Sequence, residues 1–199
     1  MAATDLITLE DARAFLQKQV GQTATDDVLA DLVTRASGMI GRYCDVRFLP
    51  VETSTSRLFL WDGGSVISLA PFVAQSVTSV ILDYGEASQF DVSGGFRGGP
   101  EPQTDGVYYF VELDFRFIPA YTGAFSSRRA RVTGTFGYPD VPVEVQQACC
   151  VTVADWYRGR VAAFNTAFQD AGEQSAPRGP EALPQAAWRL LEPFKRPVM

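Results

Sequence analysis

Two carboxylates, Glu112 and Asp114, are the residues of this chain best spaced for acid–base chemistry. They stand two positions apart in a stretch that has the pattern of a β-strand, so both side chains project from the same face. A glycosidase requires such a pair about 5–10 Å apart in a cleft. The solvated face of a strand presents the same pattern, and we favour that interpretation over a hydrolase.

A glycine-rich stretch superficially resembles a phosphate-binding loop. Gly94-Gly95 and Gly98-Gly99 flank Phe96-Arg97. A loop that binds phosphate continues into Lys-Ser or Lys-Thr at the start of a helix, and neither feature follows here. The stretch is therefore predicted to be a flexible hairpin tip.

The chain has no histidine and three cysteines, Cys44, Cys149 and Cys150. Without histidine it has no His-based triad, no His zinc site and no usual general base near neutral pH. Cys149 and Cys150 are adjacent on a predicted helix and point about 100° apart, so they suit neither a disulfide nor a metal clamp. We expect buried thiols in a reducing compartment, with no catalytic residue, metal or cofactor.

Composition indicates a folded, acidic protein. Of the 199 residues 46% are hydrophobic and 20% are charged, and the formal net charge is −6. Residues 1–127 hold 8 Lys and Arg against 16 Asp and Glu, a balance of −8; residues 128–199 hold 9 against 7, a balance of +2. Such a chain is not built to wrap nucleic acid through a broad basic face. Two oppositely charged halves suit head-to-tail contact between copies.

No apolar run approaches the roughly 20 residues of a membrane span, and the first residues lack the basic start of a signal peptide. We expect an intracellular origin and no membrane partner.

Two N-terminal helices are predicted. Thr8 and Asp11 have the spacing of a capping box, which begins a short helix that ends near Gly21. A second helix begins at Thr25 and carries an apolar stripe with helical spacing to Tyr43. The stripe consists of Leu29, Leu32, Val33, Ala36, Ile40 and Tyr43.

A β-rich section follows. Strands are predicted at residues 54–61, 66–69, 76–83, 107–117 and 131–136. Asp62-Gly63-Gly64 connects the first two strands, with glycine where the connection needs a positive φ. Residues 85–106 are predicted to be loop-rich.

The chain then turns from sheet to helix at Gly137-Tyr138-Pro139-Asp140. Gly and Pro end the strand, and Pro142 suits the first turn of a helix, where its missing amide has no partner. Apolar residues at three- and four-residue spacing then predict a long helix. They are Val145, Ala148, Cys149, Thr152 and Trp156.

The fold class predicted is α+β. It is a helical bundle with a β-rich insertion at about 51–136. The helices are two N-terminal ones, a long one near 142–158 and a short C-terminal one. We predict a single domain over 1–199, whose parts are 5–49, 51–136, 141–160 and a linker with a C-terminal docking segment at 161–199.

This order of parts resembles the phage head–tail connector family, the adaptor proteins of long-tailed bacteriophages and gene transfer agents. The first marker is the G-Y-x-x-V-P corner at residues 137–142, directly before the long helix. The second is S-V-T-S-V at residues 76–80, after Pro71. The resemblance covers most of residues 6–160.

The resemblance implies a structural protein of the virion neck, assembled in the host cytoplasm and not an enzyme. Copies form a ring, commonly of twelve subunits, beneath the portal. The ring extends the DNA channel, through which DNA passes without specific binding, and presents a platform to the stopper or tail-completion protein. An acidic channel lining, inferred from the net charge, would keep DNA phosphates from sticking.

Two groups of candidate contact residues follow. The apolar, basic C-terminal segment is a candidate for portal docking, with packing of a last helix on its own subunit as the alternative. Its residues are Trp188, Leu191, Phe194, Lys195 and Arg196. Arg128, Arg129 and Arg131 are candidates for contact with a neighbouring subunit, with a solvated strand end as the alternative.

The alternative function is a β-rich carbohydrate- or peptide-binding module of a larger particle. Its candidate contact residues are the aromatic side chains of Trp61, Tyr108, Tyr109 and Tyr121.

Overall fold

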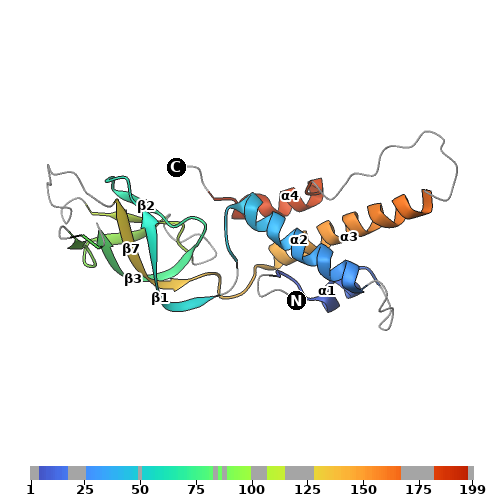
Figure 1. Cartoon of the computed structure of the whole chain (residues 1–199), viewed down its shortest axis with the longest axis horizontal. Coiled ribbons are helices and arrows are strands. Elements are labelled where there is room, and N and C mark those ends of the chain that lie inside the picture. The colour runs from blue at the N-terminus through green and yellow to red at the C-terminus, as the bar shows by residue number, and fades with distance from the viewer. Residues whose placement is uncertain are drawn as a thin grey trace. The chain divides into compact units, whose positions relative to one another are not determined.

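The structure, a computed structural model, describes residues 5–17, 26–48, 51–82, 85–86, 89–99, 107–114, 128–166 and 182–196. The chain forms two compact units. The helical unit comprises Met1–Cys44 and Val141–Met199, and the β unit comprises Asp45–Asp140. Four α-helices and two antiparallel sheets lie in the described residues, which confirms the predicted α+β class (Figure 1).

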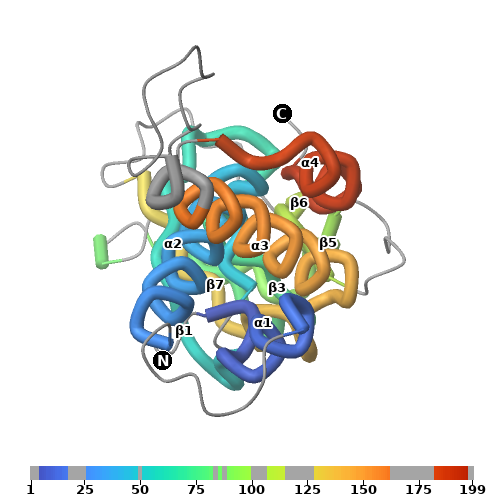
Figure 2. Tube along the Cα trace, turned by 90° about the vertical axis from the view of Figure 1, so that its right-hand side faces the viewer, coloured from blue at the N-terminus to red at the C-terminus, as the bar shows by residue number. Residues whose placement is uncertain are grey.

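The helical unit is built around its longest helix. α1 (Leu9–Phe15), α2 (Asp26–Cys44) and α4 (Gln185–Leu191) all contact α3 (Val143–Thr166). Figure 2 shows α3 with the other three helices around it. A short 3-10 helix, η2 (Glu192–Phe194), continues α4.

The capping box predicted before α1 is present. The Asp11 amide donates to Thr8 Oγ1 at 3.1 Å, and the Thr8 amide donates to Asp11 Oδ2 at 2.8 Å. Arg13 of α1 forms an ion pair with Asp26 at the start of α2. Because a seven-residue helix is marginal by itself, this pair and the cap help to hold α1 on the bundle.

The predicted apolar stripe of α2 is the buried face of that helix. Leu29, Ala36 and Ile40 are fully buried. α2 contacts α3, and in α3 Val145 and Ala148 are buried. α3 runs to Thr166 and is therefore longer than predicted, since its last turns contain no proline and two alanines.

Two sheets form the β unit. Sheet A has the strand order β1-β7-β3-β4, and sheet B has the order β2-β6-β5. The strands of sheet A are β1 (Glu52–Leu60), β7 (Arg129–Phe136), β3 (Ala74–Leu82) and β4 (Phe90–Asp91). Those of sheet B are β2 (Val66–Ser68), β6 (Phe110–Leu113) and β5 (Phe96–Gly99).

Both sheets contribute to one apolar core. Phe59, Val80 and Val132 come from sheet A, and Ile67 and Val111 come from sheet B. All of them alternate with more exposed neighbours along their strands. Period-two alternation is what places one face of each sheet against the core.

Asp62-Gly63-Gly64 connects two strands, β1 and β2, as predicted. β1 pairs with β7 and β2 pairs with β6, so this corner carries the chain from sheet A to sheet B. Gly63 does have a positive φ of 94°. The corner is fixed by Trp61, whose indole N–H donates to the Gly64 carbonyl at 2.7 Å.

The prediction that Gly94-Gly95 and Gly98-Gly99 form a flexible hairpin tip is wrong for Gly98-Gly99. These glycines lie in β5 and pair with Val111 and Phe110 of β6. A Cβ on Gly98 would lie 2.4 Å from the Tyr108 ring, and one on Gly99 would lie 2.2 Å from the Phe110 ring. The glycines therefore leave room for aromatic rings, a packing role that a sequence pattern does not distinguish from flexibility.

Candidate assembly surfaces

The corner that follows β7 is anchored in the β unit. Gly137 has a φ of 95°, and its amide donates to the Val73 carbonyl at 2.9 Å. Tyr138 is buried, with its hydroxyl 2.9 Å from that of Tyr109 and its ring 5.2 Å from that of Phe48. The tyrosine of the G-Y-x-x-V-P marker therefore fixes the chain's exit from the sheet, and the marker carries no chemistry.

The aromatic residues of the alternative binding module do not form an exposed platform. Trp61 and Tyr109 are each only 1% exposed. Tyr108 is half-buried over Gly98, and Tyr121 lies outside the described residues. Trp61 and Tyr109 act as core residues, so they offer no ring face to a sugar or a peptide.

Glu112 and Asp114 lie where the favoured interpretation places them. Both residues are exposed, Glu112 on β6 and Asp114 just after it. Glu112 pairs across the ladder with Arg97 of β5, so a carboxylate and a guanidinium share one solvated face. This is the solvated strand face expected from the sequence.

Two of the three thiols, those of Cys44 and Cys149, are buried as predicted. Burial raises the pKa of Cys44 and of Cys149 to about 12. Cys150 is half-buried, and burial raises its pKa too. The described residues contain no group of three or more His, Cys, Asp or Glu side chains that could hold a metal ion. None of the described helices is long and apolar enough to span a membrane.

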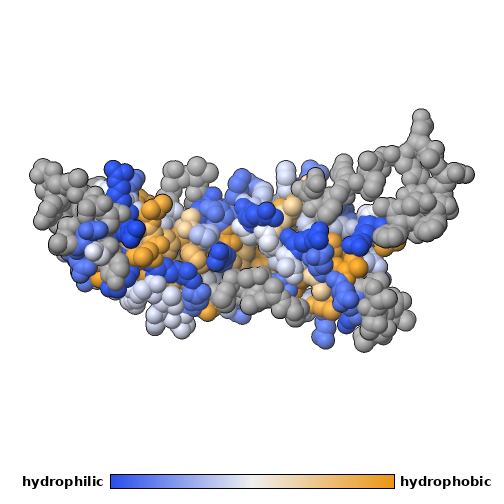
Figure 3. Space-filling view, in the orientation of Figure 1, coloured by the Kyte–Doolittle hydropathy of each residue, from blue (hydrophilic) through white to orange (hydrophobic). Residues whose placement is uncertain are grey.

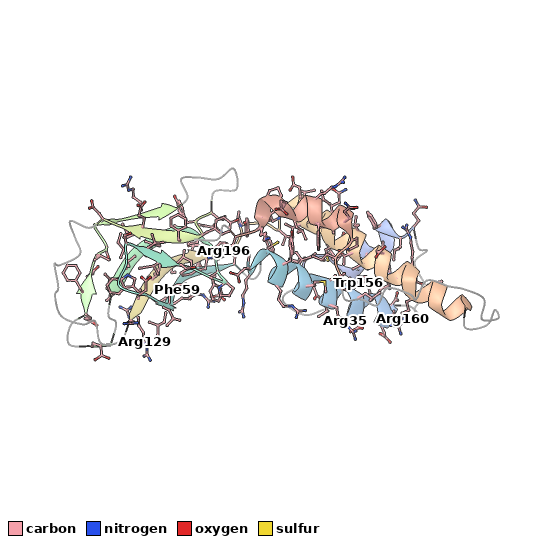
Figure 4. The ribbon with its side chains drawn as sticks, turned by 90° about the horizontal axis from the view of Figure 1, so that it is seen from above. Arg35, Phe59, Arg129, Trp156, Arg160 and Arg196 are labelled. Carbon is pink, nitrogen blue, oxygen red and sulfur yellow. The ribbon has the colours of Figure 1, made fainter. Side chains whose placement is uncertain are left out.

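The C-terminal segment folds onto the helical unit. Leu191, Phe194 and Arg196 are buried, and the Arg196 amide donates to the Cys44 carbonyl at 3.0 Å. The indole N–H of Trp156 on α3 donates to the Ala182 carbonyl at 3.2 Å (Figure 4). Of the five candidate docking residues, the structure therefore places three in the interior of the unit. Trp188, at 49% exposed, and Lys195 remain on its surface.

Tyr43, at the end of α2, contacts three residues of this segment. Its ring stacks on Trp188 with centroids 6.0 Å apart and planes 12° apart. Its hydroxyl donates to Glu192 Oε2 at 3.1 Å, and Lys195 Nζ lies 5.5 Å from its ring centroid. Burial and the nearby Glu192 carboxylate raise the pKa of Tyr43. The sequence placed Tyr43 in the apolar stripe of α2 and gave no sign of these partners.

Of the three candidate arginines, Arg129 and Arg131 lie at the start of β7 and Arg128 directly precedes it. Arg129 pairs across the ladder with Leu60, and Arg131 pairs with Leu58. Residues paired in this way project from the same face of the sheet. Leu60 is 87% exposed and Leu58 is 55% exposed, so two leucines and two arginines form one surface, which we call the β1–β7 face. Figure 4 shows Phe59 inside the β unit and Arg129 at its margin.

The two leucines of the β1–β7 face were missed by sequence reasoning. Leu58 and Leu60 alternate with Phe59, which faces the core, so the period-two pattern alone could have assigned them to the opposite face. Figure 3 shows hydrophobic residues of the β unit at the surface among hydrophilic ones.

The same face continues across sheet A to a carboxylate. Arg131 pairs with Ile81, which pairs in turn with Asp91 of β4. Hydrogen bonds from Ser93 lower the pKa of Asp91, and the charge of Arg131 lowers it further. Sheet A therefore has a basic, apolar end at β1 and β7 and an acidic residue at β4.

Comparison with known proteins gives a likeness to a solved structure. No protein family that was scanned matches the chain, and no curated protein matches it. A chain of a solved structure described as "Neck of empty GTA particle computed with C6 symmetry" is 16% identical, with a TM-score of 0.56. The alignment covers 100% of this chain and 94% of that chain. The chain therefore has, over its whole length, the fold of a protein from the neck of a gene transfer agent (GTA) particle.

Proposed function

We propose that this chain is a head-to-tail adaptor, a structural protein of the neck of a tailed phage or gene transfer agent. The observation that carries the proposal is the likeness to a GTA neck chain, since it spans both the helical unit and the β unit. The G-Y-x-x-V-P corner, placed between the sheet and α3, supports the same assignment.

The adaptor acts as a ring of identical subunits. The neck structure that contains the similar chain was computed with six-fold symmetry. A ring of twelve copies is compatible with that symmetry. Under this proposal the ring binds the portal on one side and the stopper or tail-completion protein on the other. It assembles in the host cytoplasm and stays in the neck of the virion.

The role of such a ring is geometric and electrostatic. The formal net charge of −6 disfavours retention of DNA phosphates, so DNA can slide through the channel. The described side chains do not suggest catalysis. The thiols of Cys44 and Cys149 are buried, and the carboxylates of Glu112 and Asp114 are solvated. We therefore propose a protein without enzymatic activity.

Portal docking begins, in this proposal, with the side chains that the C-terminal segment exposes, Trp188 and Lys195. Leu191, Phe194 and Arg196 reach a partner only after α4 and η2 leave the bundle. Re-exposing a buried Leu or Phe costs about 1.5–3 kcal/mol each. Contacts with the portal must exceed that cost before the buried residues can exchange partners.

Deletion of the gene tests the proposal directly. An adaptor is required for tail attachment, so cells without it should accumulate DNA-filled heads that lack tails, visible by electron microscopy. Supply of the intact chain in trans should restore tailed particles. Normal tailed particles in the deletion strain would refute the proposed function.

A matched pair of variants tests the docking role. Trp188→Ala with Lys195→Glu should reduce tailed particles, because both side chains are exposed. The two changes also remove contacts with the Tyr43 ring, so Tyr43→Ala, which removes the same contacts within the unit, is measured beside them. Gln147→Ala, an exposed change on α3, serves as the control. Truncation before α4 is a poorer test, since it also removes the buried residues Ala187 and Leu191 from the bundle.

A further inference from the structure

We infer that the β1–β7 face binds a second copy of this chain, and that the surface it meets is the acidic end of the helical unit at α1 and the start of α2. The inference rests on the proposed function in one respect: copies must assemble. It adds the two surfaces through which they do so.

The first observation is an edge strand without charged protection. β1 is nine residues long and, among the described strands, pairs within sheet A only with β7. Natural proteins protect such edges with charged side chains, proline or bulges. β1 has one register shift, between Glu52 and Thr55, and it lies at the other end of the strand from Leu58 and Leu60. Arg57, the arginine of β1, projects from the opposite face, where it pairs with Glu52 and its guanidinium carbon lies 3.7 Å from the Phe72 ring centroid. It therefore leaves Leu58 and Leu60 without a charged neighbour on their own strand.

The second observation is that arginines lie beside these leucines. Arg129 lies directly across from Leu60, and the exposed Arg128 precedes it. Apolar residues bordered by arginine are typical of the centre of a protein interface. Their partner must combine an apolar side chain with carboxylates.

The acidic end of the helical unit has that composition. Phe15 on α1 is 45% exposed, close in sequence to the exposed Glu10 and Asp11. The ion pair between Arg13 and Asp26 ties α1 to the start of α2, where Asp27 is also exposed. α1 and the first turn of α2 together carry four acidic residues and one basic one.

These surfaces differ from each other and both are present on every copy. Contact between them is therefore heterologous, the type that generates rings when the rotation closes. A two-fold contact of one β1–β7 face with another would place arginines against arginines. DNA fits the β1–β7 face less well than a protein does, because leucine side chains make no favourable contact with phosphates.

Cysteine crosslinking tests the pairing of the two surfaces. Leu60→Cys and Phe15→Cys chains, each otherwise full length, are mixed with purified portal and oxidised, and linked peptides are identified by mass spectrometry. We expect a disulfide between position 60 of one chain and position 15 of another. Mixing each variant with the wild-type chain measures the background from the half-buried Cys150.

The outcomes separate the inference from the proposed function. A wild-type chain that assembles, with no 60–15 link in the mixed variants, overturns the inference alone. Links between position 60 of two copies overturn it in favour of a two-fold contact. A wild-type chain that never assembles, with or without portal, overturns the proposed function and this inference together.

Charge and apolar variants give a second readout. Leu60→Lys and Arg129→Glu should each weaken self-association about tenfold, since each introduces a mismatched group at the interface. Glu10→Arg combined with Arg129→Glu should recover part of the loss. Ser76→Lys, an exposed change on β3 of the same sheet, is the control and should leave assembly unchanged. Equal assembly of all four variants would contradict the inference.

Discussion

At the scale of single residues, Tyr138, the tyrosine of the G-Y-x-x-V-P marker, is a packing residue. Tyr138 is buried against Phe48, and its hydroxyl meets that of Tyr109. A buried hydrogen bond between two hydroxyls fixes the rotation of both rings, so it contributes to specificity as well as stability. The corner therefore gives the chain a fixed exit from the sheet.

Removal of either hydroxyl should destabilise the β unit. Tyr138→Phe and Tyr109→Phe should each lower the free energy of unfolding by about 1 kcal/mol, the usual cost of a lost buried hydrogen bond. The double variant should lose less than the sum, because both changes remove the same bond. Chemical denaturation of the four proteins measures this coupling; strict additivity would show that the two hydroxyls do not interact.

The buried thiols should be inert in the folded protein. With a pKa of about 12, Cys44 and Cys149 hold almost no thiolate at pH 8. A thiol reagent should therefore modify neither residue until the chain unfolds, whereas all three cysteines should react in denaturant. Rapid modification of Cys149 in the native protein, read by mass spectrometry, would show that its site is open.

The same shift makes stability depend on pH. The folded pKa of about 12 lies above the ordinary thiol value of 9.0, so the unfolded chain loses these protons first. The free energy of unfolding is thus fully retained below about pH 9 and falls as the pH rises towards 12. Cys149→Ser should make that fall shallower in alkaline denaturation curves.

At the scale of elements, the β3–β7 ladder depends on one close backbone contact. Gly134 lies opposite Val77, beside a register shift in the ladder. A Cβ at this position would lie 2.0 Å from the Ser76 carbonyl oxygen. Backbone atoms cannot yield as a flexible side chain can, so this glycine permits the strands to approach.

Gly134→Ala should therefore destabilise the β unit by about 3 kcal/mol or more, as expected for overpacking against backbone. Gly94→Ala is the matched control in the same unit, because an added Cβ there meets nothing within 4 Å. Thermal unfolding of the two variants should differ clearly; equal melting temperatures would mean that the ladder can widen at Gly134.

The C-terminal segment depends on Tyr43 in a way that can be measured. Tyr43→Ala removes the ring stacked on Trp188, a contact worth about 0.5–1.5 kcal/mol. Hydrogen exchange in α4 and η2 should rise several-fold while exchange in the β unit stays unchanged. Tyr43→Phe, which keeps the ring and loses only the bond to Glu192, should have the smaller effect. Unchanged exchange in Tyr43→Ala would assign the segment's stability to its buried residues alone.

Sequence reasoning succeeded where local physics decides. The capping box of Thr8 and Asp11, the stripe of α2 and the corner at Gly137 all depend on neighbours within a few residues. Strand pairing, in contrast, is not decided by neighbours within a few residues. The crossing from one sheet to the other at Gly63 depends on contacts between distant segments and was not predicted. The glycines beneath Tyr108 and Phe110 depend on such contacts too, so the hairpin tip was predicted wrongly.

The candidate sites show the same limit. Arg129 and Arg131 could be found from the cluster of charges, but only the register of β1 and β7 shows that Leu60 and Leu58 lie beside them. Likewise the composition of the C-terminal segment indicated an interface anchor. Only the fold shows that Leu191 and Phe194 already pack within their own unit.

At the scale of the whole molecule, the chain leaves the helical unit after Cys44 and returns to it at Val141. The β unit is thus a continuous insertion with its own apolar core. The helical unit is completed by the chain that follows the insertion, since α3 contacts α1, α2 and α4. Each copy of the chain therefore has two units with different surfaces.

The central claim is that copies of this chain assemble on a portal. The most direct measurement is the mass of the purified chain alone and after mixing with a purified portal ring, by native mass spectrometry or mass photometry. The proposal predicts a portal-dependent complex that carries many copies of the chain, up to about twelve for a closed ring. A chain that remains monomeric and leaves the mass of the portal unchanged would contradict it.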